Sequence, residues 1–331
     1  MRTARIIGEG VSYYHCMSRI IHGQMWLDDS EKERFRCIMR DVADFAGVEV
    51  MTYALMTNHL HLLLRVPAKC EIPEDEVLHR IEGLYGHPRA AGVAMQLRDL
   101  RAEERGAEAA ELLRSYTYRM HDLSQYMKMV MQRFTMSYNK RHGLRGHLWE
   151  QRFKSILVEG KPDAISTMAA YIDLNAVRAG IVGDPKNYRF CGYGEALAGR
   201  KAARQGMTCI FDILGNEGSW SAGARAYRKQ LFMHAGVKSK GCTVEREKIQ
   251  EVLDNGGKLS KAELLRCKVR YLTDGVVLGG KNFVEDVFKE HRDEFGLRRK
   301  TGARKPGFGE WGSLFTMRDL RLKPVSLSPQ K

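Results

Sequence analysis

The sequence predicts an α+β protein whose core is an antiparallel sheet with helices packed on it. Three observations favour this class. Residues 11–18, 48–55 and 60–66 are β-prone, residues 28–46 carry apolar side chains at helical spacing, and the order along the chain is therefore β, α, β, β. This order fits a sheet with helices packed on one face. The hydrophobic share of 44% among 331 residues supports a packed core and argues against disorder.

The first predicted helix, residues 28–46, has signals at both ends. Ser30 and Glu33 have the spacing of a capping box at its start, and Gly47 follows its last apolar residue. Between them, helical spacing relates Phe35, Ile38, Met39, Val42 and Phe45.

An insertion separates the third strand from the later core elements. Residues 68–120 are polar and rich in Glu and Arg, with helical patterns at 75–84 and 93–105, and their charges are typical of a solvated face. An amphipathic helix at 123–139 follows, and residues 156–159 form the last predicted core strand.

Composition narrows the class of partner. The formal charge of +14 and the pI near 9.5 point to a polyanion, most plausibly nucleic acid, although a merely basic protein has the same composition. Seven dispersed cysteines without a C-x-x-C pair indicate reduced thiols and a cytoplasmic location. No apolar run reaches membrane-spanning length, and the N-terminus lacks an apolar signal region, so no membrane partner is expected.

The segment MTYALMTNHLHLLLRVP, residues 51–67, carries the clearest chemical signal. His59 and His61 are two residues apart in a predicted strand, so their imidazoles share one face, and the leucines between and after them point to the other. Two neutral imidazoles at this separation can bind one divalent cation and leave other positions open. The alternative is a pair of partly exposed histidines with no ligand.

A second segment, residues 167–180, is helical and contains Tyr171 and Asn175. Their i, i+4 spacing places both on one face of a helix. A tyrosine beside a metal can act as a nucleophile toward phosphorus, and an asparagine oxygen can complete the ligand set. The alternative for Tyr171 is a core tyrosine. Tyr126 and Tyr138 rank lower because neither has an asparagine one turn further on.

Residues 140–154, KRHGLRGHLWEQRFK, are basic and contain aromatic residues. Cations there can neutralise phosphates, and Trp149 and Phe153 can stack on bases of a single strand. The alternative is a basic loop around a core tryptophan. The candidate DNA contacts are Arg19, Arg141, Arg145, Trp149, Arg152, Lys154 and Arg178.

Four motifs in order resemble the single-tyrosine HUH transposases, in particular the REP-associated tyrosine transposases. They are Tyr14-His15-Cys16-Met17-Ser18-Arg19, the Met56–Leu63 run MTNHLHLL, the Gly146–Phe153 run GHLWEQRF and the Tyr171–Gly180 run YIDLNAVRAG. Cys16 replaces a usual valine. Ala176 replaces a usual proline, which affects the expected helix geometry rather than the chemistry. The resemblance covers roughly residues 5 to 200.

This resemblance implies an HUH, ferredoxin-like core that cleaves and rejoins single-stranded DNA through a 5′-phosphotyrosine. It implies Tyr171 as the nucleophile, and His59, His61 and Asn175 as ligands of Mg²⁺ or Mn²⁺. It also implies a hairpin of the REP type as partner. Most members are homodimers and some REP-associated members are monomers, and the sequence leaves both states open.

The domain division follows from these segments. Residues 1–200 are expected to form the transposase domain, 201–241 a helical linker segment, and 242–331 a small, mostly helical module. In that module, the patterns at 243–253, 261–271 and 282–290 resemble a helix-turn-helix, although any small helical bundle has the same pattern. A basic tail at 297–305 is expected to be disordered and to contact phosphates.

Three other functions fit parts of the pattern. A non-catalytic nucleic-acid-binding protein could retain the fold without cleaving DNA. A metal hydrolase could activate water at the histidine pair and form no covalent adduct. A relaxase or replication initiator of the HUH superfamily often has a third histidine ligand or paired tyrosines, and the motif order here favours the transposase branch.

Overall fold

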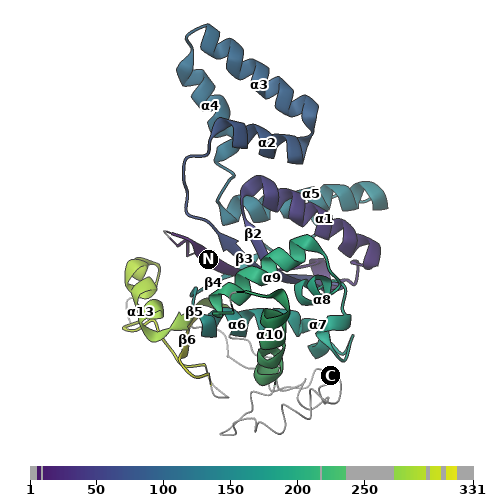
Figure 1. Ribbon diagram of the computed structural model, residues 1–331, viewed down its shortest axis with the longest axis vertical. Coiled ribbons are helices and arrows are strands. Elements are labelled where there is room, and N and C mark those ends of the chain that lie inside the picture. The colour runs from purple at the N-terminus through teal and green to yellow at the C-terminus, as the bar shows by residue number, and fades with distance from the viewer. Residues whose placement is uncertain are drawn as a thin grey trace.

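The computed structural model describes residues 6–8, 10–216, 218–235, 272–295, 299–306 and 311–318. They form a six-stranded mixed sheet in the order β2-β3-β1-β4-β5-β6 with helices around it, so the predicted α+β class is confirmed (Figure 1). The β4–β5 pair is parallel and every other pair is antiparallel. The strands are β1 (Ser12–Arg19), β2 (Glu49–Leu55), β3 (His59–Val66), β4 (Lys154–Val158), β5 (Gly275–Gly280) and β6 (Leu314–Arg318).

The register of β1 against β3 decides which side chains share a face. Met17 lies opposite His61 and Arg19 lies opposite His59. Directly opposed residues of an antiparallel pair point to the same side, so His15, two residues before Met17, lies on the histidine face as well. The alternate residues, including Cys16 and Leu62, are fully buried on the other face.

Helices α1 (Asp29–Ala46) and α5 (Leu123–His142) pack together over the face opposite the histidines (Figure 1). The N-cap of α1 is Asp28, whose carboxylate accepts a hydrogen bond from the Glu31 amide at 2.8 Å. The predicted capping box of Ser30 and Glu33 is therefore wrong by two residues. Gly47 ends α1 in the left-handed conformation, as expected.

The histidine face is covered by a second layer, so helices lie on both faces and not on one. Its members are α6 (Pro162–Asp173), α7 (Asn175–Arg178), α8 (Gly192–Leu197), α9 (Lys201–Ile213) and α10 (Trp220–Ala235). Short 3₁₀ turns lie at Ile21–Gly23 (η1) and Pro185–Asn187 (η2). The carboxyl of Asp173 joins this layer to the sheet by accepting hydrogen bonds from the Thr52 and Tyr227 hydroxyls, each at 2.6 Å.

The insertion forms a helical arm of α2 (Glu74–Tyr85), α3 (His87–Ala102) and α4 (Gly106–Thr117). The arm lies beyond α1 and α5 at one end of the long axis of the molecule (Figure 1). The helix predicted at 75–84 corresponds to α2, the one predicted at 93–105 overlaps only the later part of α3, and α4 was not predicted. Val77 and Ile81 of α2 are buried, whereas the face of α3 that carries Met95 is exposed.

The described part of residues 242–331 contains β5, α13 (Lys281–Glu290), the 3₁₀ turn Arg292–Glu294 (η4) and β6. The helix predicted at 282–290 is confirmed by α13, and the helices predicted at 243–253 and 261–271 lie outside the described residues. The two strands were not predicted. Because β5 pairs with β4, these strands extend the core sheet and do not form a separate helical unit.

The expectation that residues 297–305 form a disordered tail is also wrong for residues 299–305, which the structure describes. Arg299 is 7% exposed, and its guanidinium donates hydrogen bonds to the Thr301 and Gly302 carbonyls. It also lies over the rings of Phe288 and Phe295. A charge held in this way is unavailable to DNA phosphates.

Candidate active site

Strand β3 presents His59 and His61 side by side on one face of the sheet. Their ring centroids are 5.1 Å apart, and His61 is 4% exposed. The i, i+2 alternation of a strand accounts for this arrangement. The register adds His15 from β1, whose ring stacks on that of His61 at a centroid distance of 5.1 Å.

One ring nitrogen of each β3 histidine is already occupied. Nδ1 of His59 donates to the Asn58 amide oxygen at 2.6 Å, and Nδ1 of His61 is 2.9 Å from Nε2 of His15. Partners of this kind fix the tautomer and orientation of a ligating histidine. The Nε2 atoms of His59 and His61 are therefore the ones left to bind a metal.

The three imidazoles are held neutral. Burial lowers the pKa of His15 to about 3 and that of His59 to about 4, and the cations Arg178 and Arg19 add to the effect on His59. Burial and the neighbouring histidines place the pKa of His61 well below its usual range. A histidine binds metal only in its neutral form, so these rings are ready to ligate at neutral pH.

Tyr171 and Asn175 approach the histidines from the helices above the sheet. The Tyr171 ring lies 5.9 Å from the rings of both His15 and His61, and the Asn175 side chain is near enough to the His59 imidazole to act on its pKa, which it raises. The expected continuous helix is interrupted, because α6 ends at Asp173 and α7 begins at Asn175. Leu174, with φ −80° and ψ 2°, lies at this break, and the two side chains still reach the same site.

Arg178 lies against Tyr171 and does not extend from the surface. Its guanidinium carbon is 4.0 Å from the centre of the tyrosine ring, and the side chain donates to the Tyr171 carbonyl. Burial raises the pKa of the Tyr171 phenol, while Arg178 acts to lower it. Arg178, which was predicted to contact DNA, is thus placed to act on Tyr171.

The donor set fits a divalent ion with mixed nitrogen and oxygen ligands. It offers two imidazole nitrogens and one amide oxygen, and each imidazole has an ordered partner at its other nitrogen. Across the described ranges, no group of three or more His, Cys, Asp and Glu side chains has the arrangement of a metal site. His15 is not a further ligand in this geometry, because its Nε2 faces His61.

The other predicted DNA contacts divide into two groups. Arg19, Arg145 and Arg152 are exposed. Arg141 forms an ion pair with the buried carboxylate of Glu31, and Lys154 pairs with Asp274 at 3.1 Å. The first group is free of such ion pairs among the described residues, whereas the second would have to exchange a carboxylate for a phosphate.

Trp149 and Phe153 are poorly placed to stack on bases. The Trp149 ring packs against Phe35 and Phe134, and its Nε1 donates to the Met131 carbonyl at 3.2 Å. Phe153 is 8% exposed. The edge of Trp149 does line a hollow of about 410 Å³, whose wall also includes Ile21, Thr135, His147, Gln151 and Arg152.

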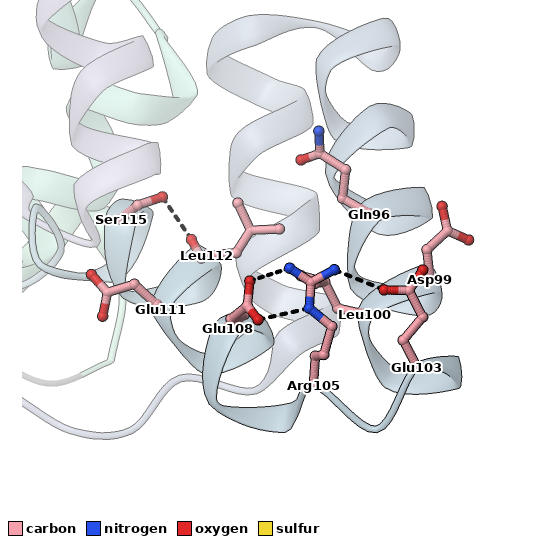
Figure 2. Close-up of a pocket in the computed structure, with 9 residues that line it drawn as sticks. All are labelled: Gln96, Asp99, Leu100, Glu103, Arg105, Glu108, Glu111, Leu112 and Ser115. Carbon is pink, nitrogen blue, oxygen red and sulfur yellow. Dashed lines mark hydrogen bonds and ion pairs between the residues drawn. The ribbon is translucent and has the colours of Figure 1, made fainter.

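A second hollow of about 530 Å³ lies in the helical arm between α3 and α4 (Figure 2). Arg105 crosses it and pairs with Glu103 and Glu108. This hollow is formed within the arm, and none of the histidines or Tyr171 lines it.

Four residues of this site were not assigned a role from the sequence. Asn58 and His15 belong to the motifs, but their contacts depend on side-chain geometry and strand register. Leu272 and Asp274 precede β5: the Leu272 backbone affects the pKa of His15, and Asp274 that of Tyr171. No local pattern in the sequence indicates these long-range contacts.

Two of three comparisons with known proteins found a match. A family described as "Transposase IS200 like" matches residues 11–87. The solved structure of a REP-associated tyrosine transposase bound to a REP hairpin is similar at 12% identity and a TM-score of 0.38, covering 60% of this chain and 86% of that one. No curated protein matches the chain. In the described ranges, no helix is long and apolar enough to span a bilayer. The family match includes the strands that carry all three histidines, so residues 11–87 are similar to the IS200-like transposases.

Proposed function

We propose that this transposase cleaves and rejoins single-stranded DNA through a covalent 5′-phosphotyrosine at Tyr171. The observation that carries the proposal is the position of the phenol ring, 5.9 Å from two neutral imidazoles and beneath the guanidinium of Arg178. A core tyrosine with no chemical role has no need of these neighbours.

The ion in this proposal is Mg²⁺ or Mn²⁺, held by Nε2 of His59, Nε2 of His61 and the side-chain oxygen of Asn175. When bound, such an ion polarises the scissile phosphate and stabilises the charge that develops on its oxygens.

In the chemical step, the Tyr171 oxygen attacks phosphorus as its phenolic proton is lost. The P–O bond to the 3′-oxygen breaks, and that oxygen leaves as a 3′-hydroxyl after taking a proton from solvent. Arg178 favours the phenolate form of the nucleophile. Attack by a free 3′-hydroxyl on the phosphotyrosine reverses the step, so no external energy source is needed.

The proposed substrate is an unpaired strand beside a DNA hairpin. The net charge of +14 favours a polyanion, and Arg19, Arg145 and Arg152 are exposed cations within or next to the motifs. Arg19 also lies opposite His59 in the sheet, which places it at the margin of the catalytic residues. Within this proposal, dimer and monomer are both open.

Tyr171→Phe tests the proposal directly. The full-length protein is incubated with labelled single-stranded hairpin DNA and Mn²⁺, and adducts are separated on a denaturing gel. The wild type is expected to form a covalent band that disappears with chelator. The variant should lose the band, with cleavage reduced by about 10³-fold or more, and still bind the DNA.

Tyr138→Phe is the matched control, because this tyrosine packs against Trp26 and His142, away from the catalytic histidines. It should retain the adduct. Normal cleavage by Tyr171→Phe would show that the nucleophile is misassigned. Metal-dependent cleavage without an adduct would indicate a hydrolase, and binding alone would indicate a non-catalytic protein.

A further inference from the structure

His15 and His61 form a buried pair of imidazoles on neighbouring strands. Both side chains are at most 4% exposed, and the 2.9 Å contact joins His15 Nε2 to His61 Nδ1. The rings are stacked with an interplanar angle of 23°. A hydrogen bond between two neutral imidazoles uses one proton, so one ring must donate and the other accept.

Metal ligation at His61 would decide the direction of this bond. A neutral imidazole that ligates through Nε2 carries its proton on Nδ1. Nδ1 of His61 must then donate, and Nε2 of His15 must accept. The proton of His15 is consequently on its own Nδ1.

We propose that His15 is a positioning residue, which accepts the Nδ1 proton of His61 and so keeps His61 Nε2 unprotonated and aimed at the metal. This inference rests on the proposed function, because it takes His61 as a ligand. It assigns to the first motif a role that complements the His59–His61 pair.

The environment of His15 favours this role over simple packing. His15 is fully buried, and its Nδ1 makes no hydrogen bond of standard geometry within the described residues. Burying an imidazole with one unsatisfied nitrogen is unfavourable, and an apolar residue would fill the space at lower cost. The contact with His61 is the interaction that an apolar residue could not supply.

Two substitutions separate the hydrogen bond from the volume of the ring. His15→Phe fills the space without an acceptor, whereas His15→Gln has an amide oxygen that can accept the proton of His61. Mn²⁺ affinity is measured on the DNA-free full-length protein by electron paramagnetic resonance. Loss of a partner of this kind weakens metal binding by about 10- to 100-fold, so His15→Phe should fall in that range. His15→Gln should stay near the wild type.

Two controls accompany these variants. His87→Phe removes an exposed histidine of the arm and should leave Mn²⁺ affinity unchanged. His61→Ala should abolish binding at the site. If His61→Ala loses Mn²⁺ and His15→Phe does not, the role of His15 is refuted while the proposed function stands. If His61→Ala binds Mn²⁺ like the wild type, the proposed metal site itself fails.

The tautomers provide a measurement that does not depend on a variant folding. Long-range ¹H–¹⁵N correlation spectra of the wild type saturated with Mg²⁺ should show both His15 and His61 protonated at Nδ1. A proton on Nε2 of His15, donated to His61, would contradict the proposed direction of the bond.

Discussion

Tyr171 experiences two opposed influences on the acidity of its phenol. Burial disfavours the phenolate and raises the pKa, whereas the guanidinium of Arg178, 4.0 Å from the ring centre, favours the phenolate. The resulting pKa is above the usual value. In its proposed role as nucleophile, Tyr171 therefore depends on Arg178, together with any bound metal, to reach the phenolate form.

Arg178→Gln is expected to raise the pKa of Tyr171 further. In the proposed mechanism the phenolate attacks, so the variant has less of the reactive form at any pH below that pKa, and each unit of increase in the pKa lowers the rate by about tenfold. Single-turnover adduct formation measured against pH should show the rising limb displaced to higher pH. Arg145→Gln is the control: it removes an exposed cation and should weaken DNA binding without moving that limb.

At the scale of single residues, the sequence predicts which side chains meet but not how each is held. The alternation of β3 is local, so the shared face of His59 and His61 follows from spacing alone. The contact of His15 with His61 requires the register of β1 against β3, which is set by pairs far apart in the chain. The packing of Trp149 against Phe35 and Phe134 is likewise a tertiary effect.

Helix α9 approaches the sheet so closely that one of its positions admits only glycine. A Cβ on Gly206 would lie 2.2 Å from the Val50 carbonyl oxygen and 2.7 Å from that of Met51, both parts of the β2 backbone. Gly206→Ala should therefore destabilise the protein by about 1–3 kcal/mol, measured by urea unfolding. Gly92→Ala is the matched control in α3, where a Cβ would have no atom within 4 Å. It should stabilise the protein by about 0.5–1 kcal/mol, and equal losses in both variants would contradict the close-approach explanation.

The carboxyl of Asp173 links α6 to β2 and α10, and it titrates abnormally. Burial raises its pKa to about 6, despite hydrogen bonds from Thr52 and Tyr227 that oppose the shift. The pKa of Asp173 is higher in the folded than in the unfolded protein. Its contribution to the free energy of unfolding is therefore greatest below pH 4, and this contribution, at most about 3 kcal/mol, is lost as the pH rises through about 6. Asp173→Asn should remove this part of the pH dependence. Unfolding free energies of both proteins at pH 4.5, 6 and 8 test it, and parallel profiles would refute it.

At the scale of elements, strongly amphipathic helices were predictable and their ends were not. Residues 123–139 were predicted as helix, and α5 extends to His142. Asp28 and Ser30 are both suitable caps, and only the tertiary setting selects Asp28. The break at Leu174 has no glycine or proline to indicate it, since the family's usual proline is Ala176 here.

The helical arm is attached at its base and is independent of the histidine face. Arg119 donates to the Tyr85 hydroxyl at 2.6 Å, so the chain returns beside the end of α2. The segment 87–117 contains five acidic and five basic side chains, so its removal leaves the net charge at +14. Replacing it with a short Gly-Ser linker should preserve adduct formation and the salt dependence of DNA affinity. A tenfold loss of affinity at constant salt would instead place the arm in the DNA interface.

For the whole molecule, the α+β class was predictable and the extent of the sheet was not. The strand β5 reads GVVLGG, and its glycines weaken any local strand signal. It is a strand because β4 offers a free edge, with Leu157 opposite Val277. The proposal of a separate module for residues 242–331 therefore needs revision for the described part of that segment.

The β4–β5 pairing also sets when, during translation, the surroundings of Tyr171 can be completed. Leu157 and Val277 are 120 residues apart, so a ribosome needs roughly 6 to 24 s to synthesise the chain between them at ordinary rates of elongation. Tyr171 is synthesised early in that interval. Leu272, whose backbone acts on His15, and Asp274, whose carboxylate pairs with Lys154, are synthesised only at its end. The open edge of β4 is exposed to non-native pairing over the same period. Tyr171, the proposed nucleophile, is thus synthesised well before Leu272 and Asp274, and its surroundings are completed only when the strand after Asp274 has been synthesised and paired.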